Sequence, residues 1–235
     1  MTDIAGYSHP AAGTQPPHDV PGYGSTLKRH PQRELVRLDH MPGEVAAPRM
    51  TQDRYPAQAD LTQVAGRAAV GERIIVAGRV LDEAGRGVPG AMVEIWQANA
   101  AGRYAHAGDQ HDAPLDPNFQ GHGRVFADDE GHYRFTTIRP GAYPWRNHPN
   151  AWRPMHIHYS LFGVGFAQRL ITQVYFHGDP LLPLDPIFNA IPDAAARDRL
   201  LARFDLDLTE PEFALGYRFD IVLRGRDATP TETPA

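Results

Sequence analysis

The stretch ERIIVAGRVLDEAGRGVPGAMVEIWQ, residues 72–97, contains two apolar runs separated by a segment rich in Gly. ERIIVAGRV (72–80) and AMVEIWQ (91–97) have the β-branched and apolar composition of strands. The connecting DEAGRGVPG (82–90) has the composition of a turn. The stretch therefore predicts a β-hairpin.

Short strand-like segments continue along the rest of the chain. GRVFAD (123–128) and HYRFTTI (132–138) flank the turn DDEG and predict a second hairpin. Three more predicted strands are RPMHIHYSLF (153–162), QRLITQVYF (168–176) and YRFDIVLRG (217–225). Only DAAARDRLLARF (193–204) has helical spacing, with Asp193 as the candidate N-cap. Many short strands with Gly/Pro turns predict a mainly β protein, a two-sheet β-sandwich with one or two short helices.

The composition divides the chain into three parts. Residues 1–65 are rich in Pro and Gly, and apolar residues such as Leu35 and Leu38 favour an extended arm docked on another subunit over a free tail. Residues 66–226 form the predicted β-sandwich domain, which holds the candidate site residues apart from one in the arm. Residues 227–235 form a C-terminal tail.

Charge and composition exclude several classes of protein. The formal net charge of −5 gives no electrostatic reason to expect nucleic acid or anionic lipid as a partner. The absence of cysteine excludes disulfides, zinc–thiolate sites, iron–sulfur clusters and Cys nucleophiles. No segment approaches the ~20 apolar residues of a membrane helix, and the first residues, MTDIAGYSHP, do not resemble a secretory signal. We therefore expect a cytoplasmic protein whose metal ligands are N and O atoms.

The stretch WRPMHIHYS (152–160) places two histidines one residue apart in a predicted strand. Because side chains two residues apart point to the same face of a strand, His156 and His158 share one face. Met155, Ile157 and Tyr159 alternate with them, so the other face is apolar. In an arbitrary HxH the two residues are most often polar groups on a solvated strand, but facing a cavity they become metal ligands.

Several common metal and catalytic motifs lack their remaining residues. A cupin would place Glu three or four residues after the second His, where this chain has YSLFG. HGDP (177–180) has the His-x-Asp start of a 2-His-1-carboxylate iron site, but no later histidine follows, so it is interpreted as a turn after a strand. Neither HExxH nor GxSxG is present.

Two loop tyrosines offer the missing donors. Tyr143 lies in RPGAYPWRN and Tyr104 in QANAAGRYAH. A lone loop tyrosine is usually a packing residue, but two tyrosines with two histidines form a sensible ligand set for a hard trivalent ion. A free phenol has a pKa of about 10, and only a strongly Lewis-acidic cation stabilises the phenolate at neutral pH.

Residues 20–226 closely resemble the intradiol ring-cleavage dioxygenases. The resemblance rests on six segments: GERIIVAGRVLDEAGRGVPGAMVEIWQANAAGRYAH, DPNFQGHGRV, RPGAYPWRN, WRPMHIHYSLFG, LITQVYFHGDP and YRFDIVLRG. The first hairpin pattern alone also occurs in non-catalytic transthyretin-like sandwiches, so by itself it supports the fold and not an activity.

The resemblance implies one mononuclear non-haem Fe(III) per chain. It implies Tyr104 and His156 as equatorial ligands and Tyr143 and His158 as axial ligands, with Tyr143 also the base that accepts a substrate proton. It further implies Arg153 beside the bound catechol and Gln173 behind the ligands. The positions that it assigns to the substrate pocket or to packing near the iron are Tyr23, Trp145, Ile187 and Trp96.

The resemblance also implies a reaction and a partner. The non-helical arm and the intact ligand set match the iron-bearing beta chain of hetero-oligomeric members, which works with a homologous alpha chain. The implied reaction, part of aromatic catabolism, is cleavage of 3,4-dihydroxybenzoate (protocatechuate) by O₂ to 3-carboxy-cis,cis-muconate. The alternatives are an intradiol enzyme for another catechol, such as hydroxyquinol, and a non-catalytic transthyretin-like binding or adhesion module.

Overall fold

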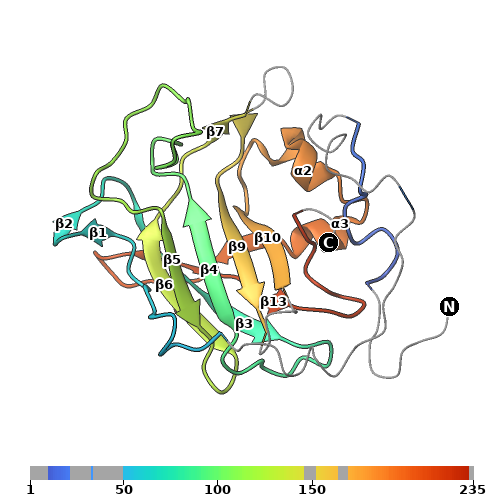
Figure 1. Ribbon diagram of the computed structural model, residues 1–235. Coiled ribbons are helices and arrows are strands. Elements are labelled where there is room, and N and C mark those ends of the chain that lie inside the picture. The colour runs from blue at the N-terminus through green and yellow to red at the C-terminus, as the bar shows by residue number, and fades with distance from the viewer. Residues whose placement is uncertain (1–9, 22–32, 34–49, 146–151, 164–168, 233–235) are drawn as a thin grey trace.

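The computed structural model describes residues 10–21, 33, 50–145, 152–163 and 169–232. Short strands dominate these parts of the chain (Figure 1). The strands are β1 (Gln63–Val64), β2 (Arg67–Ala68), β3 (Arg73–Leu81), β4 (Met92–Gln97), β5 (His122–Phe126), β6 (His132–Ile138), β7 (Tyr143–Pro144), β8 (Trp152–Arg153), β9 (His156–Phe162), β10 (Arg169–Phe176), β11 (Leu201–Phe204), β12 (Leu215–Arg218) and β13 (Ile221–Val222). The helices are η2 (Leu182–Leu184), a 3₁₀ turn, α2 (Pro186–Asn189) and α3 (Ala194–Asp198).

The main strands form two layers that β11 joins. One layer has the order β5-β4-β9-β10, and the other contains β6, β3 and β12, with β13 against the end of β3. β11 runs parallel to β10 on one side and antiparallel to β12 on the other, so hydrogen bonds continue from one layer to the next. The predicted β-sandwich is confirmed, in a form close to a barrel.

The core lies between the two layers. Ile157, Tyr159 and Leu161 of β9 point into it and are essentially inaccessible to solvent. From the opposite layer, Val76 of β3 and Phe135 of β6 belong to the same cluster. The alternation that was predicted for β9 is therefore observed, and the other face of this strand is free to carry a site.

The two hairpins predicted from the sequence are wrong. β3 pairs with β6, β12 and β13, whereas β4 pairs with β5 and β9, so the segment between β3 and β4 crosses from one layer to the other. The segment between β5 and β6 makes a second crossing, because these strands also lie in different layers. At Gly87 an added Cβ would lie 2.0 Å from the carbonyl oxygen of Glu130, so the two crossing turns pack against each other. Strand and turn composition was correct, but it does not specify the pairing partner.

The predicted helix over 193–204 is much shorter in the structure. The side chain of Asp193 accepts a hydrogen bond from the backbone N–H of Ala196, so the predicted N-cap is confirmed. The helix ends at Asp198, and Leu201–Phe204 forms β11. This strand provides the ladder that joins the two layers, and those tertiary hydrogen bonds override the local helical preference.

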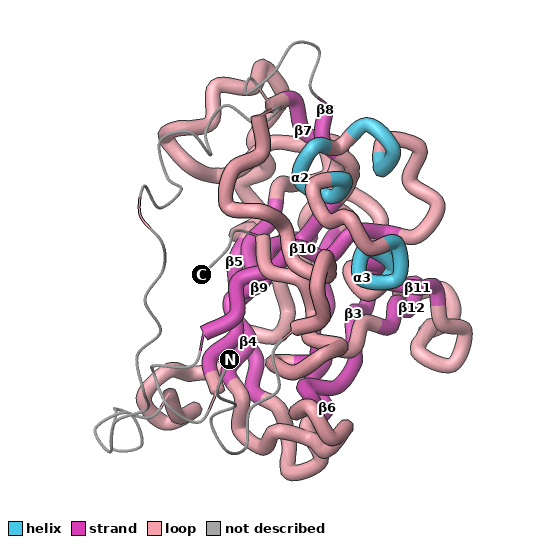
Figure 2. The backbone as a smooth tube through the Cα atoms, turned by 90° about the vertical axis from the view of Figure 1, so that its right-hand side faces the viewer, coloured by secondary structure: helices cyan, strands magenta, loops and turns pink. Residues whose placement is uncertain are grey.

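Helices α2 and α3, the α-helices of the described residues, lie beside β10 at one side of the sandwich (Figure 2). Phe188 of α2 and Ala196 of α3 pack with Tyr175 of β10 in a second, smaller apolar cluster. They therefore cover part of the outer face of the layer that contains β9 and β10. No helix in the described part of the chain is long and apolar enough to span a membrane.

The described part of the N-terminal arm contacts residues late in the sequence. The backbone N–H of Ala11 bonds the carbonyl of Arg226 at 3.2 Å, and that of Asp193 bonds the carbonyl of Gly13 at 3.0 Å. These contacts dock residues 11–13 on the sandwich. Tyr23, which was assigned to the substrate pocket, lies outside the described residues.

Candidate metal centre

The two histidines of the HxH motif lie on the outer face of β9. The ladder places Trp96 of β4 and Gln173 of β10 on either side of His158, and Tyr175 of β10 beside His156. Trp96 stacks on His158 with ring centroids 4.8 Å apart and the planes 5° from parallel. His156 is 3% exposed. The prediction that the histidines share the face opposite the apolar residues is confirmed, and Trp96 packs against His158.

Tyr104 lies in a tightly bonded loop after β4. The side-chain oxygen of Asn99 accepts hydrogen bonds from the backbone N–H groups of Ala101 and Arg103, each at 3.0 Å. The buried carboxylate of Asp109 accepts one from the backbone N–H of Tyr104 at 2.7 Å. Because the backbone is fixed on both sides of it, the tyrosine has a defined direction toward the histidines.

Tyr143 is held next to a charged residue of the site. It lies on β7, and its ladder partner on β8 is Arg153. The rings of Tyr104 and Tyr143 meet edge to face, with centroids 5.2 Å apart. The two predicted tyrosines, from loops 39 residues apart, are therefore brought together.

Glycine backbones allow the two tyrosine loops to approach each other. At Gly102 φ is +76°, and an added Cβ would lie 1.9 Å from the carbonyl oxygen of Ala142. The backbone N–H of Gly141 bonds the carbonyl of Asn99 at 2.9 Å. A side chain at Gly102 would therefore separate the loops that carry Tyr104 and Tyr143.

Three candidate donor atoms converge at a spacing that fits one metal ion. The hydroxyl oxygen of Tyr104 lies 3.1 Å from Nε2 of His158 and 3.4 Å from Nε2 of His156. Donors that each bind one first-row metal ion at about 2 Å lie roughly 3 Å apart. The edge-to-face contact adds Tyr143 to the same cluster. Two phenols and two imidazoles form a chemically sensible ligand set for a hard trivalent ion.

The protonation states of two of these groups follow from burial. Burial raises the pKa of the Tyr104 hydroxyl well above its ordinary value, although the charge of Arg153 partly opposes the shift. Without a cation the phenol therefore keeps its proton, and a Lewis acid is required to form the phenolate. Burial, followed by the charges of Arg153 and His158, lowers the pKa of His156 well below its ordinary value. His156 is therefore neutral, the form that binds metals.

Arg153 is buried in a polar network beside the histidines. Its Nη2 donates to Gln173, to the hydroxyl of Tyr175 at 2.9 Å and to the carboxylate of Asp185 at 2.9 Å. Burial alone lowers the pKa of Arg153, but Tyr175 and Asp185 raise it above its ordinary value. Its guanidinium carbon lies 5.5 Å from the ring centroid of Trp145. Arg153 therefore stays charged. It contacts Gln173 and Tyr175 of β10, next to the histidine strand, and Trp145 of the cavity wall.

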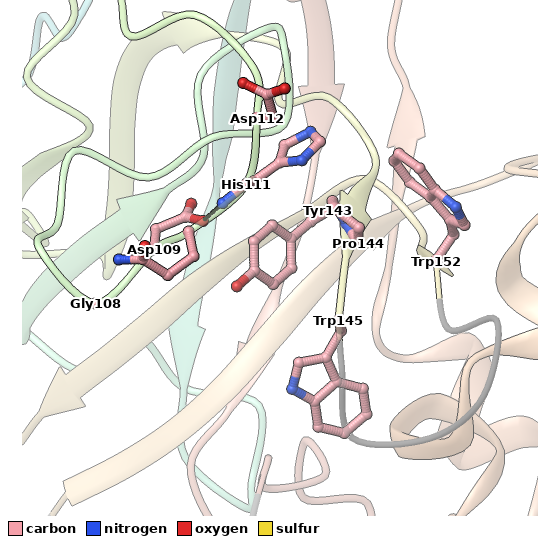
Figure 3. Close-up of a pocket in the computed structure, with 9 residues that line it drawn as sticks. Gly108, Asp109, His111, Asp112, Tyr143, Pro144, Trp145 and Trp152 are labelled. Atoms are coloured by element: carbon pink, nitrogen blue, oxygen red, sulfur yellow. Dashed lines mark hydrogen bonds between the residues drawn. The ribbon is translucent and has the colours of Figure 1, made fainter.

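The donor cluster opens into a cavity of about 460 Å³. Tyr104, Tyr143, His156 and His158 line it, as do the predicted residues Trp145, Arg153 and Ile187. A second cavity of about 510 Å³ adjoins it, because Tyr143 and Trp145 line both. Figure 3 shows this second cavity, with Tyr143 at its centre and Trp152 to one side. The first is large enough for an aromatic ring, and the second shares part of its wall.

Four residues of the site were missed by sequence reasoning. Tyr175 follows Gln173 at the same-face spacing of a strand, so the alternation rule could have found it. Asp185 caps α2 by accepting from Ile187, and a cap motif does not indicate an ion pair. Asp109 is an unremarkable loop residue by sequence.

The fourth missed residue, Glu232, lies in the C-terminal tail. Its carboxylate is 3.0 Å from Nδ1 of His158. Burial acts to raise the pKa of Glu232, but hydrogen bonds and charges from His158, Gln173 and Arg153 together outweigh it, so the pKa lies below its ordinary value. No local pattern distinguishes this residue, since only the folded tail brings it to the site.

A second group of residues, in the turn between β5 and β6, has the residue types of a metal site but not its burial. Asp128, Glu130 and His132 have potential ligand atoms within 4.8 Å of one another, and all three are exposed. Asp128 accepts from the backbone N–H groups of Glu130 and His132. The carboxylate therefore stabilises the turn between β5 and β6, and the exposed group requires no ion to explain it.

Comparison with known proteins gives consistent matches. The family model described as "Dioxygenase" matches residues 45–225, and the model described as "Protocatechuate 3,4-dioxygenase beta subunit N terminal" matches residues 7–41. The chain is 59% identical to the protocatechuate 3,4-dioxygenase beta chain of Burkholderia cepacia over 228 residues, 96% of this chain and 94% of that one. It is 30% identical to the alpha chain from the same organism over 169 residues, 71% of this chain and 79% of that one.

A solved structure extends the match to three dimensions. The dioxygenase domain of a dioxygenase carbohydrate-binding protein fusion from Streptomyces sp. SirexAA-E matches with a TM-score of 0.51 at 26% identity. The match covers 80% of this chain and 97% of that one.

Proposed function

This chain belongs to the dioxygenase family, in its intradiol branch, and we propose that its site cleaves protocatechuate with O₂ to give 3-carboxy-cis,cis-muconate. The ring opens between its two hydroxyl-bearing carbons, and both oxygen atoms of O₂ enter the product. The observation that carries the proposal is that the Tyr104 hydroxyl lies within 3.4 Å of Nε2 of both His156 and His158, in a cavity that Tyr143 and Arg153 also line.

The proposed cofactor is one non-haem iron(III) ion per chain, held by Tyr104, Tyr143, His156 and His158. When bound, the ion supplies a Lewis acid that favours the deprotonated catechol and prepares its ring for O₂. The protein's own contribution is a fixed donor set. His156 is kept neutral by burial, and His158 is fixed in plane by Trp96.

The second contribution of the protein is to accept a substrate proton and to stabilise negative charge. The substrate loses two hydroxyl protons, one of them to solvent. Tyr143, which faces both cavities, would be a phenolate with the ion bound, and its oxygen is placed to take the other proton. The catechol O–H bond breaks as the Tyr143 O–H bond forms. Arg153 is permanently charged, and it stabilises negative charge that develops on the ring. Gln173 and Asp185 fix its direction.

The third contribution is the shape of the cavity. Trp145 and Ile187 form apolar wall beside the donors. They place an aromatic ring near the cluster and exclude water from it. The preference among substituted catechols depends on this wall. Activity with protocatechuate therefore has to be compared with activity with catechol and hydroxyquinol.

We also propose that the chain works with a homologous alpha chain. The Burkholderia cepacia relative that is 59% identical to this chain is named a beta chain. The alpha chain of that organism is also similar to this sequence. Exposed apolar side chains on and near β11 and β12 provide surface for such a contact. These are Phe204, Leu206, Phe213 and Leu215.

The test is the colour, iron content and activity of the full chain, expressed alone and with its alpha chain. We expect about one iron per beta chain, a reddish charge-transfer band and O₂ uptake that is fastest with protocatechuate, all strongest in the co-expressed sample. Tyr104→Phe should shift the band. Tyr159→Phe, a buried tyrosine on the core face of β9, should not. A colourless protein that carries zinc and consumes no O₂ would contradict the proposal.

A further inference from the structure

The two histidines differ in what binds their outer nitrogen. Nδ1 of His156 is 2.7 Å from the backbone carbonyl oxygen of Pro154. Nδ1 of His158 is 3.0 Å from the carboxylate of Glu232. A carbonyl is neutral and a carboxylate is charged, so the two imidazoles are polarised to different extents. In metal sites, such outer partners fix the tautomer of the ligand and raise its basicity.

The tail that carries Glu232 is docked along β10. On this edge of β10, β11 pairs with Tyr175 and Phe176. It does not pair with the earlier residues of β10. The tail bonds there, because the backbone N–H of Glu232 donates to the carbonyl of Ile171 at 2.8 Å. The hydroxyl of Thr172 also donates to the carbonyl of Pro230 at 2.7 Å. These hydrogen bonds therefore fix the position of Glu232 along β10.

The arm adds a second anchor on the other side of the tail. The backbone N–H of Thr231 donates to the side-chain oxygen of Gln15 at 2.9 Å. The side chains of Glu232 and His158 are only 20% and 12% exposed, so their contact is shielded from water. A shielded carboxylate–imidazole hydrogen bond is stronger than the same pair on an open surface.

We propose that Glu232 is a positioning residue of the metal centre. Its carboxylate accepts the Nδ1–H of His158, so the lone pair of Nε2 points toward Tyr104 and the shared ion. Trp96 fixes the plane of the ring, and Glu232 fixes its rotation within that plane. The carboxylate also places a negative charge next to the ligand set, which favours the trivalent over the divalent ion. This inference rests on the proposed iron site.

The experiment uses three variants of the full chain, each co-expressed with the alpha chain and loaded with iron. Glu232→Ala removes the hydrogen-bond acceptor and the charge. Glu232→Gln keeps an acceptor oxygen and removes the charge. Thr231→Ala is the matched control, because the bond of Thr231 to Gln15 uses its backbone N–H. The readouts are the rate of iron loss to a chelator, the reduction potential and the charge-transfer band.

Glu232→Ala should lose iron about 10- to 100-fold faster than the parent, the usual scale for removing a ligand's outer partner. Glu232→Gln should retain iron better than Glu232→Ala, and its potential should still move to more positive values because the charge is gone. Thr231→Ala should behave like the parent in all three measurements.

Two results would overturn the role of Glu232 alone. In the first, both Glu232 variants keep the parent's iron affinity, potential and band. In the second, Thr231→Ala loses iron as fast as Glu232→Ala, which would assign the effect to docking of the tail and not to the carboxylate. A parent protein that binds no iron would overturn this inference and the proposed function together.

Discussion

At the scale of single residues, the ion pair between Arg153 and Asp185 changes what a mutation at Arg153 tests. The carboxylate of Asp185 is fully buried and bonds Arg153 at 2.9 Å. Removing the arginine would leave this charge without its partner in a medium that solvates it poorly. Loss of activity in such a variant would therefore mix a catalytic effect with a loss of stability.

We expect Arg153→Ala to lower the free energy of unfolding by ~3–5 kcal/mol, the cost of breaking a buried pair. Arg153→Ala/Asp185→Asn should recover part of that loss, because no unpaired charge remains. Urea unfolding of the four proteins in the cycle measures the coupling. Additive losses would show that the pair is not coupled in the fold.

The same double variant isolates the catalytic part. It lacks the guanidinium but avoids the stranded carboxylate, so its iron content should stay close to that of the parent. Turnover with protocatechuate should still fall by about 10²-fold or more, the scale for one preorganised charge at a developing anion. Unchanged turnover at full iron loading would remove Arg153 from the mechanism.

Residue types were the part of the site that the sequence predicted well. His156 and His158 followed from strand alternation, because a two-residue period is a local property. Tyr104 and Tyr143 could be nominated from loop chemistry, and the family resemblance paired them with the histidines. Asp185 and Glu232 could not be found, since their contacts depend on tertiary packing that no local pattern specifies.

At the scale of elements, the approach of the two tyrosine loops depends on Gly102. It has φ +76° and no room for a Cβ, because the carbonyl of Ala142 would lie 1.9 Å away. Gly85 offers a matched comparison. It also has φ +76°, but nothing lies within 4 Å of an added Cβ.

We expect Gly85→Ala to cost ~1–2 kcal/mol for the left-handed backbone alone. Gly102→Ala should cost ~1–3 kcal/mol more from the steric overlap, and it should also weaken iron binding and shift the visible band, because Tyr104 and Tyr143 move apart. Thermal unfolding and an iron assay on both variants check this. Equal stability and an unchanged band in the two variants would show that the loops do not need this close approach.

Elements were predicted less completely than residue types. The strands from 72 to 97 were located by composition, but their partners were not, since β3 pairs with β6, β12 and β13, whereas β4 pairs with β5 and β9 in the other layer. The segment 193–204 was predicted as one helix because its apolar spacing is helical. Its last third became β11, whose hydrogen bonds to both layers outweigh a propensity worth only tenths of a kcal/mol per residue.

At the scale of the whole molecule, the candidate metal centre and the main core are on opposite faces of the same layer. Tyr159 points into the core, and its neighbours His156 and His158 point to the cavity. The core is therefore complete without a ligand in the site. Under the proposed function, iron would contribute to stability by mass action and not as a structural support.

We expect iron-free protein to keep its far-UV circular dichroism and to unfold cooperatively. Its melting temperature should be lower than that of the loaded form, by the equivalent of ~2.7 kcal/mol when free iron is a hundredfold above its dissociation constant. Calorimetry of both forms is the measurement. Loss of cooperative unfolding on iron removal would contradict a core that is independent of the site.

The iron-free form should also depend on pH through His156. Its pKa is lowered in the folded state from an ordinary value of 6.5, so below that pH the unfolded chain binds a proton that the folded chain does not. Stability should therefore fall as pH drops from 7 toward 5. His156→Gln should flatten this part of the profile.

The pairing of β3 has a consequence for how the protein is made. Its parallel neighbours β12 and β13 come from residues 215–222. At the ~5–20 residues per second of protein synthesis, β3 leaves the ribosome on the order of 10 s before they do. Through that interval its layer has no partner on one side, and the sandwich that supports the histidine strand is open. If iron is the cofactor, we expect it to bind only after β12 and β13 have been made, so its supply follows synthesis of these strands instead of accompanying synthesis of β3.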